Sequence, residues 1–146
     1  MQTKKSILAI VLAVMTFSLT SCDREKVLNA SEIPAEITEY ASTHFPNNAI
    51  LQVVEDVDGL SKTYNVILKD NISLEFNRKK EINDIDGTTK LPESVIPSEI
   101  TRYVAANFPN NVITDWELED KHQQVGLDNG LDLEFTLKGD FIRIDD

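Results

Sequence analysis

Cysteine is nearly absent from this sequence, since Cys22 is the only one in 146 residues. A single thiol excludes a disulfide framework and a cysteine-based metal site, and it leaves no spare thiol nucleophile. Histidine is scarce too, because His44 and His122 are the only two and their sequence surroundings are unrelated. Two such histidines make neither a metal site nor a triad, and the chain has no glycine-rich phosphate loop. We therefore predict no catalytic residues, no metal and no cofactor.

Positive charge is also scarce: 14 Lys and Arg stand against 25 Asp and Glu, which gives a net charge of −11. Binding to nucleic acid depends on basic side chains that neutralise phosphates, so we predict no nucleic-acid partner. Anionic lipid headgroups would likewise repel such a surface. The acidity can attract a cationic partner, and it can equally serve solubility alone.

No apolar run is long enough to cross a bilayer as a helix, which needs about 20 residues. The longest run, residues 7–17, follows Lys4 and Lys5 and is followed by LTSC at 19–22. Positive charge, an apolar run and small residues in this order are typical of a secretory signal. LTSC resembles the lipobox of bacterial lipoproteins, in which the cysteine is lipidated and becomes the mature N-terminus.

The lipobox resemblance implies an address and an anchor. Residues 1–22 form the predicted lipoprotein signal peptide, Cys22 is the predicted lipidation site, and residues 23–32 form a tether. Acyl chains would hold the protein to a membrane that it does not span. We expect it in the cell envelope of a Gram-negative bacterium, either periplasmic or surface-exposed.

What the sequence does contain is recurrence. The recurring blocks are IPAEIT and IPSEIT at 33–38 and 96–101, FPNN at 45–48 and 108–111, and LEF at 74–76 and 133–135. The spacing is 63 positions for the first two blocks and 59 for the third. The second copy therefore lacks four residues, most simply in a hairpin near 58–62. Recurrence at this spacing indicates one supersecondary unit used twice.

Each copy is predicted to begin with a helix and to continue as strands. Apolar residues at helical spacing are Ile33, Ile37, Tyr40, Ala41 and Phe45 in the first copy, and Ile96, Ile100, Tyr103, Val104 and Phe108 in the second. The proline after each phenylalanine ends the helix. Alternating apolar residues follow, and Asn129-Gly130 between two such runs predicts a hairpin. The predicted fold class is α+β: two tandem repeats, each a helix packed on an antiparallel sheet of about four strands.

The IPxEI block, the helix that ends in FPNN and the hairpin that ends in LEF resemble the PepSY-like domain family. That family is similar in architecture to the beta-lactamase inhibitory protein. The resemblance covers residues 28–87 as a first PepSY-like repeat and residues 91–146 as a second. It implies a non-enzymatic extracytoplasmic module, with inhibition of a peptidase or another enzyme suggested. The inhibitory protein carries disulfides, and its inhibitory loops have no match here, so lactamase inhibition does not carry over.

One face of the predicted sheet is polar in both copies. Antiparallel sheets often leave one face to solvent, so a merely hydrated face is the simplest interpretation. The functional interpretation is a broad acidic docking surface. Its predicted contact residues are Tyr64, Ile67, Glu75, Asp132 and Glu134, with Tyr64 at the rim.

Two other features are predicted to be structural. Trp116 could dominate an interface, but its counterpart is Val53, which favours a place in the core. DVDG at 56–59 and DIDG at 84–87 echo a fragment of a calcium-binding loop. The remaining ligands of such a loop are missing, so we predict that both segments are turns.

We therefore predict a non-enzymatic, lipid-anchored envelope protein that binds a protein or peptide partner through open sheet faces. Enzyme or peptidase inhibition is one consequence that such binding can have. The alternative is a surface lipoprotein that binds a glycan or a small ligand, which exposed aromatic residues on the open face would favour. An enzyme is the third hypothesis, and Glu75 with Glu134 is its only symmetric carboxylate pair. Both lie mid-strand on a hydrated face, which disfavours that role.

Overall fold

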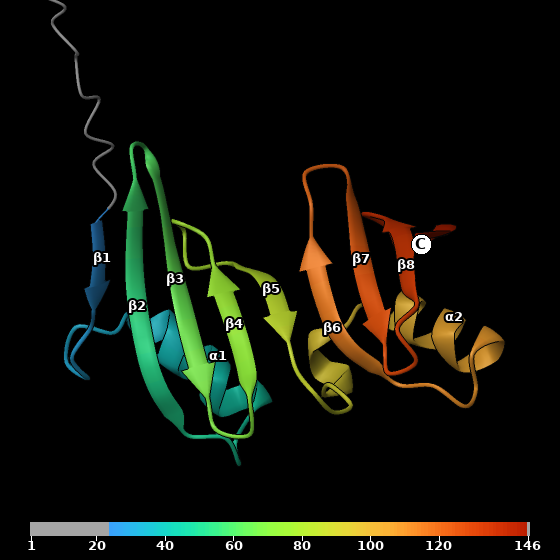
Figure 1. Cartoon of the computed structure of the whole chain (residues 1–146), viewed down its shortest axis with the longest axis horizontal. Helices are drawn as coiled ribbons and strands as arrows, with labels where there is room; N and C mark the ends of the chain where they lie inside the picture. Colours follow the sequence, from blue (N-terminus) through green and yellow to red (C-terminus); the bar gives the residue numbers. More distant parts are fainter. Residues whose placement is uncertain (1–23, 146) are drawn as a thin grey trace, which may run out of the picture.

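A single antiparallel sheet dominates the computed structural model, which describes residues 24–145 (Figure 1). Each strand pairs with the next along the chain, so the order is β1 to β9 without a crossover. The strands are β1 (Arg24–Val27), β2 (Ile50–Asp58), β3 (Ser61–Leu68), β4 (Ile72–Phe76), β5 (Ile82–Asp86), β6 (Ile113–Leu118), β7 (His122–Leu127), β8 (Asp132–Thr136) and β9 (Phe141–Asp145). The helices are α1 (Ala35–His44), the short 3-10 helix η1 (Glu93–Val95) and α2 (Ser98–Asn107).

The predicted fold class, two tandem repeats that each pack a helix on an antiparallel sheet of about four strands, is wrong. Strand β5 pairs directly with β6, with Ile85 opposite Trp116, so all nine strands form one continuous sheet and one domain. Two separate sheets would each leave a row of unpaired backbone N–H and C=O groups at the facing edges. Pairing those edges satisfies these groups. Alternation along a strand predicts its two faces but not which strand lies beside it.

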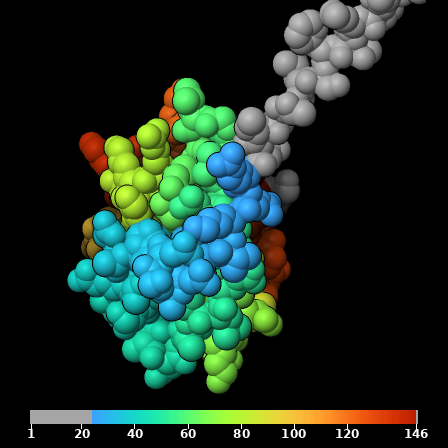
Figure 2. Space-filling view, turned by 90° about the vertical axis from the view of Figure 1, so that its left-hand side faces the viewer, coloured from blue at the N-terminus to red at the C-terminus, as the bar shows by residue number. Residues whose placement is uncertain are grey.

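Strand β1 adds a further element that the sequence pattern did not indicate. Arg24–Val27 pairs with residues 54–57 of β2, inside the segment that we expected to be a tether. Leu28 follows in the core at 9% exposure, and its N–H donates to the Val53 carbonyl at 2.9 Å. Figure 2 shows β1, in blue, along this end of the molecule. The predicted signal peptide and Cys22 lie outside the described residues.

The two α-helices end where the proline after each phenylalanine predicts, and each begins directly after another proline. Pro34 and Pro97 precede their first turns, and each helix closes when the phenylalanine before the next proline donates its N–H to a carbonyl four residues back. These bonds are Phe45 to Ala41 at 2.8 Å and Phe108 to Val104 at 2.7 Å. The following proline disfavours helical geometry at each phenylalanine.

Both α-helices pack on the same face of the sheet. The ring of Tyr40 in α1 meets Phe76 edge-on at 5.4 Å, and Tyr103 in α2 meets Phe135 at the same distance. The strand register places Phe76 and Phe135 on one face, together with Ile85. The helices therefore cover one side of the sheet, and no element of residues 24–145 covers the other.

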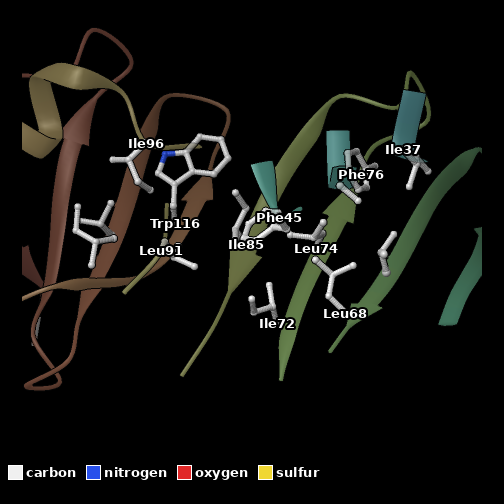
Figure 3. Packing of buried hydrophobic residues seen from close by; sticks show 14 of the residues in the cluster. Ile37, Phe45, Leu68, Ile72, Leu74, Phe76, Ile85, Leu91, Ile96 and Trp116 are labelled. Atoms are coloured by element: carbon white, nitrogen blue, oxygen red, sulfur yellow. The ribbon is translucent and has the colours of Figure 1, made fainter. Parts of the chain in front are cut away.

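The core runs across the junction between β5 and β6 without a break. Val66, Leu74, Ile85, Val125 and Leu133 are at most 1% exposed, and burial of each such side chain contributes about 1.5–3 kcal/mol. Figure 3 shows Trp116 and Ile85 on neighbouring strands at this junction. Trp116 is 6% exposed, which confirms its predicted place in the core, and its indole N–H donates to Gln123 Oε1 at 2.9 Å.

Candidate binding surface on the open face of the sheet

The strand register carries two rows of side chains across the open face. The first row is Glu75, Asp84, Glu117, Gln124, Glu134 and Arg143, on β4 to β9 in turn. The second row is Ser73, Asp86, Asp115, Gly126, Asp132 and Asp145, on the same strands. Directly opposed side chains of antiparallel strands have Cβ atoms about 4.5–5.5 Å apart. Carboxylates are thus held as close neighbours by the backbone pairing itself.

We name six of these side chains the acidic face: Glu75, Asp84, Asp86, Asp115, Glu117 and Asp132. No ion pair within residues 24–145 involves any of the six. Like charges directly opposite one another destabilise a sheet. The acidic face therefore concentrates negative charge that no described Lys or Arg balances through a salt bridge.

Asp84 lies at the centre of this charge. Burial, followed by the charges of Glu117, Glu75, Asp86 and Asp115, raises the pKa of Asp84 to about 6. Burial and neighbouring negative charge act in the same direction, because both penalise the ionised carboxylate. The surroundings of Asp84 therefore oppose ionisation of its carboxyl group and hold its pKa above the ordinary value of 3.8.

Asp115 is tied into the surface by its neighbours on β6 and β7. Burial raises the pKa of Asp115, and Asp132 and Asp86 act in the same direction. Opposing them, the Thr114 hydroxyl donates to Asp115 Oδ2 at 3.1 Å and the Gly126 N–H also bonds the carboxylate. A Cβ at Gly126 would lie 2.0 Å from Asp115 Oδ2. Glycine at 126 thus leaves room for the Asp115 carboxylate to lie across β7.

Asn83 supports Glu75 from the adjacent strand. It occupies the irregularity where the β4–β5 register shifts, and its Nδ2 donates to Glu75 Oε1 at 2.8 Å. Its Oδ1 is buried and accepts no hydrogen bond from the residues that the structure describes. Glu75 is therefore held in place by an amide rather than by a cation.

Glu134 differs from the six acidic-face residues because the side chains of Arg143 and His122 both contact its carboxylate. Arg143 Nε donates to Glu134 Oε2, and His122 Nε2 lies 3.0 Å from Oε1. The Arg143 hydrogen bond lowers the pKa of Glu134 against the opposing effect of burial, and the charges of Arg143 and His122 lower it further. Glu134 is 8% exposed. It lies on the open face, as predicted, but its carboxylate is already engaged.

The structure brings some of the predicted contact residues together and separates others. Ile67 lies on the open face at 41% exposure, and Glu75 and Asp132 belong to the acidic face. Tyr64, expected at the rim, instead lies on the helix-covered face at 4% exposure, with Lys62 Nζ 5.2 Å from its ring centroid. Tyr64 is therefore a core residue that the open face does not present.

The carboxylate pair of the enzyme hypothesis does not meet. Glu75 is on β4 and Glu134 on β8, so four strand spacings, roughly 19 Å, separate them. Pairs of carboxylates that act together on one bond, as in glycosidases, lie at most about 9.5 Å apart. These two residues cannot act as one acid–base pair.

Four residues of the acidic face were missed in the sequence: Asp84, Asp86, Asp115 and Glu117. The DIDG segment at 84–87 was expected to be a turn, but Asp84 and Asp86 lie within β5, which is paired on both sides. Their alternation with Ile85 was a usable strand signal. Their approach to Asp115 and Glu117 depends on the β5–β6 pairing, which no local pattern indicates.

Two hollows lie at matching places beside the two FPNN blocks. The larger, about 280 Å³, is lined by residues of α2, of β6 and of the segment before α2, including Leu91, Val104 and Ile113. The smaller, about 200 Å³, lies beside α1. Lys90 and Glu93 at the larger hollow pair with each other at 2.9 Å. The larger hollow therefore offers apolar contacts and little unpaired charge.

Two searches of the described residues were negative. Within residues 24–145, no group of three or more His, Cys, Asp or Glu side chains is arranged to hold a metal ion. No described helix has the length and apolar character required to cross a membrane.

Comparison with known proteins places these features in a family context. Residues 62–143 match the profile of a family described as "Putative beta-lactamase-inhibitor-like, PepSY-like". No curated protein matches the chain. A solved structure from Bacteroides vulgatus ATCC 8482, described as a "putative periplasmic protein of unknown function", has a TM-score of 0.79 and 28% identity. That match covers 84% of this chain and 100% of the other.

A second similar structure comes from Bacteroides thetaiotaomicron. It is described as a "putative calcium-regulated periplasmic protein", also with a TM-score of 0.79 and 28% identity, over 84% of this chain and 97% of that one. Another Bacteroides vulgatus structure, described as a "putative periplasmic protein", matches over 86% of this chain and 99% of its own length, again at TM-score 0.79 and 28% identity. The likeness thus extends over nearly the whole of each relative.

Proposed function

The chain belongs to the PepSY-like, beta-lactamase-inhibitor-like family, and from this premise we propose that it binds a protein or peptide partner through the open face of its sheet. The partner contributes a cationic segment that lies against the acidic face. The protein works by occupying its partner and has no catalytic role of its own. Inhibition of a peptidase or another enzyme follows where the bound segment belongs to that enzyme.

One observation carries this proposal: six carboxylates are aligned on an uncovered sheet without a salt bridge among the described residues. Holding like charges opposite one another costs stability, and a cationic ligand would offset that cost. Complementary charge also steers association and selects partners more than it raises affinity. A surface that served solubility alone would not need its charges aligned in adjacent rows.

The cell envelope is the setting that the relatives support. All three similar structures are described as periplasmic proteins. The signal peptide at 1–22 and lipidation of Cys22 remain predictions that fit this setting. Mass spectrometry of the mature N-terminus from native membranes tests both, and an unmodified Cys22 or an uncleaved leader would contradict them.

The glycan alternative has less support on this surface. Sugar-binding faces commonly present aromatic rings, but Trp116 and Tyr64 are 6% and 4% exposed on the covered side. A small ligand would instead have to use the larger hollow beside α2. The open face offers charge and little aromatic area, so a cationic segment suits it better.

The test measures binding of a labelled octapeptide that alternates lysine and threonine, with an octapeptide of alternating glutamate and threonine as the matched probe. The cationic peptide should bind, and its affinity should fall as salt rises. Asp115→Asn and Asp132→Asn should each weaken binding roughly two- to fivefold, the effect of losing one exposed ion pair. Glu39→Gln, which removes one exposed charge from α1 on the other side of the sheet, should leave binding unchanged.

Equal weakening by Glu39→Gln would mean that only overall charge matters, and unchanged binding in both Asp variants would move the site away from this face. Calcium is included as a competitor because one relative is described as calcium-regulated. Displacement of the peptide by millimolar calcium, but not by the same ionic strength of sodium, would show that the two cations share the acidic face.

A further inference from the structure

Strand β9 ends the sheet with an exposed edge. It pairs with β8 and with no other strand of residues 24–145. Large apolar side chains gather there, since Ile142 is 48% exposed, Ile144 43% and Phe141 36%. Leu137 in the preceding turn is 53% exposed. An edge strand with exposed apolar side chains is a ready template for another strand.

Strand β5, inside the same sheet, is the counterpart of β9 and is paired along the edge that β9 leaves exposed. Ile85 of β5 stands 59 positions before Ile144, in the same Ile-Asp pair of the recurring sequence. Ile85 is 0% exposed, because β6 pairs with the outer edge of β5 and brings Trp116 directly opposite. Ile144 occupies the matching place on β9 without that cover. A strand at the β9 edge would bury it.

The charges of β9 select which strand fits. Where β5 meets β6, Asp84 faces Glu117 and Asp86 faces Asp115, so both flanking pairs are repulsive. On β9 the position that matches Asp84 is Arg143, and the sequence around Ile144 reads Arg-Ile-Asp. Two antiparallel copies of this tripeptide centred on Ile144 bring each Arg143 opposite the other copy's Asp145. The edge is therefore complementary to itself.

The opposite edge of the sheet is built differently. Strand β1 reads Arg-Glu-Lys-Val, so three of its four residues are charged. Lys26 pairs with Glu32 at 2.6 Å. Charged side chains are a common protection of edge strands against pairing. Of the two edge strands, β9 is the one whose exposed apolar side chains favour pairing with another strand.

We infer that two copies of this chain pair β9 to β9, antiparallel, across a two-fold axis at Ile144. Ile144 packs on Ile144 of the second copy. Within one chain Arg143 contacts Glu134, and its Nη2 lies 3.4 Å from Asp145 Oδ1. In the dimer Arg143 keeps Glu134 and exchanges its own Asp145 for Asp145 of the second copy on each side of the axis. The contact is isologous, so it closes as a dimer and does not propagate. A single strand pair buries less than the roughly 1,200 Å² of a stable interface, so the dimer is weak and depends on concentration.

This inference does not depend on the proposed partner, because the β9 edge and the acidic face use different residues. Sedimentation equilibrium of the purified chain should show a dimer that grows between about 1 μM and 1 mM, the range of weak association. Ile144→Lys should weaken dimerisation at least about tenfold, since it places two ammonium groups at the axis. The matched control is Leu118→Lys, the same type of change at 41% exposure on β6, which should leave dimerisation unchanged.

A second pair of variants tests the edge itself in a Cys22→Ser background. Ile144→Cys should form a disulfide dimer rapidly on oxidation, because opposed Cβ atoms in a strand pair lie close to disulfide distance. Arg24→Cys on β1 should cross-link more slowly. Asp145→Arg, which would oppose Arg143 across the axis, should also reduce dimerisation and covers the case in which Ile144→Lys does not fold. A chain that stays monomeric up to 1 mM, a dimer that survives Asp145→Arg, or faster cross-linking at Arg24→Cys would each overturn the inference.

Discussion

The two faces of the sheet are built from the same strands but have opposite chemistry. On the covered face Leu74, Ile85 and Val125 are at most 1% exposed beneath the helices. On the open face the residues that alternate with them include Glu75 and Asp84, which no described salt bridge balances. The covered face stabilises the fold by burial of apolar side chains. The aligned carboxylates of the open face destabilise it, because like charges lie opposite one another.

A second contrast lies within a single row of the open face. Asp84 and Glu134 share that row, yet the pKa of Asp84 is raised to about 6 and that of Glu134 is lowered. Burial opposes ionisation in both. The difference is that Asp84 lies between Glu75 and Glu117, whereas Glu134 contacts Arg143 and His122. Local contacts with side chains such as Arg143 and His122, rather than the net charge of −11, decide which carboxylates remain available to a partner.

The largest expected effect on stability comes from placing a charge on the covered face of the sheet, among its buried apolar side chains. Ile100 of α2 is 0% exposed against the sheet, so Ile100→Asp buries an unpaired carboxylate and should cost about 4 kcal/mol or more. Because one core crosses the β5–β6 junction, the whole domain should unfold as a unit. Thermal melts followed by circular dichroism test this. Ile100→Val, expected to cost about 0.5–1.5 kcal/mol, is the control. A surviving transition at the original temperature would mean that the core is divided into independent parts.

An intermediate effect on stability is expected at Glu134, the carboxylate of the open face that contacts Arg143 and His122. Glu134→Gln keeps the shape of the side chain but leaves Arg143 and His122 facing a neutral amide, so the melting temperature should fall. A lowered carboxyl pKa stabilises the fold above its ordinary value of 4.5, and that contribution is lost as pH falls through the folded-state pKa. The gap between wild type and variant should therefore narrow in acid. Glu117→Gln, with no described ion pair, should show no such loss at pH 7, and an equal loss there would contradict the contrast.

Much of the local structure could be predicted from sequence. The helices begin after Pro34 and Pro97 and end before Pro46 and Pro109, because proline restricts both its own geometry and that of the preceding residue. The alternation of residue types also placed Ile67 and Glu75 on the open face, because successive side chains of a strand point to opposite faces of the sheet.

What could not be predicted depends on contacts between distant segments. The joining of β5 to β6, and with it the approach of Asp84 to Glu117, arises from edge pairing that leaves no mark on either strand alone. Tyr64 was expected at the rim because its counterpart is the polar Gln123, yet Gln123 is itself 3% exposed and satisfied by Trp116 and Thr136. A buried polar residue with internal partners looks in sequence like a surface residue.

The smallest expected effect is the most direct test of strain on the open face. Asp84→Asn removes one of the opposed charges, so at pH 8 the variant should be more stable than wild type. The rise of the Asp84 pKa from 3.8 to about 6 corresponds to an upper limit of about 3 kcal/mol, and solvent screening at this partly exposed site reduces the gain to about 1 kcal/mol.

The pH dependence follows from the direction of the Asp84 shift. A raised carboxyl pKa favours the folded state below the ordinary value of 3.8, and this contribution is lost as pH rises through about 6. The advantage of Asp84→Asn should therefore be full at pH 8 and shrink toward pH 4, as measured by urea unfolding at both values. Glu39→Gln on α1, outside the acidic face, is the matched control for the loss of one negative charge. If Asp84→Asn is also the variant that binds the cationic peptide less well, the same charge that weakens the fold is the one that holds the partner. A variant less stable than wild type at pH 8 would mean instead that Asp84 is held by favourable contacts and is not a source of strain.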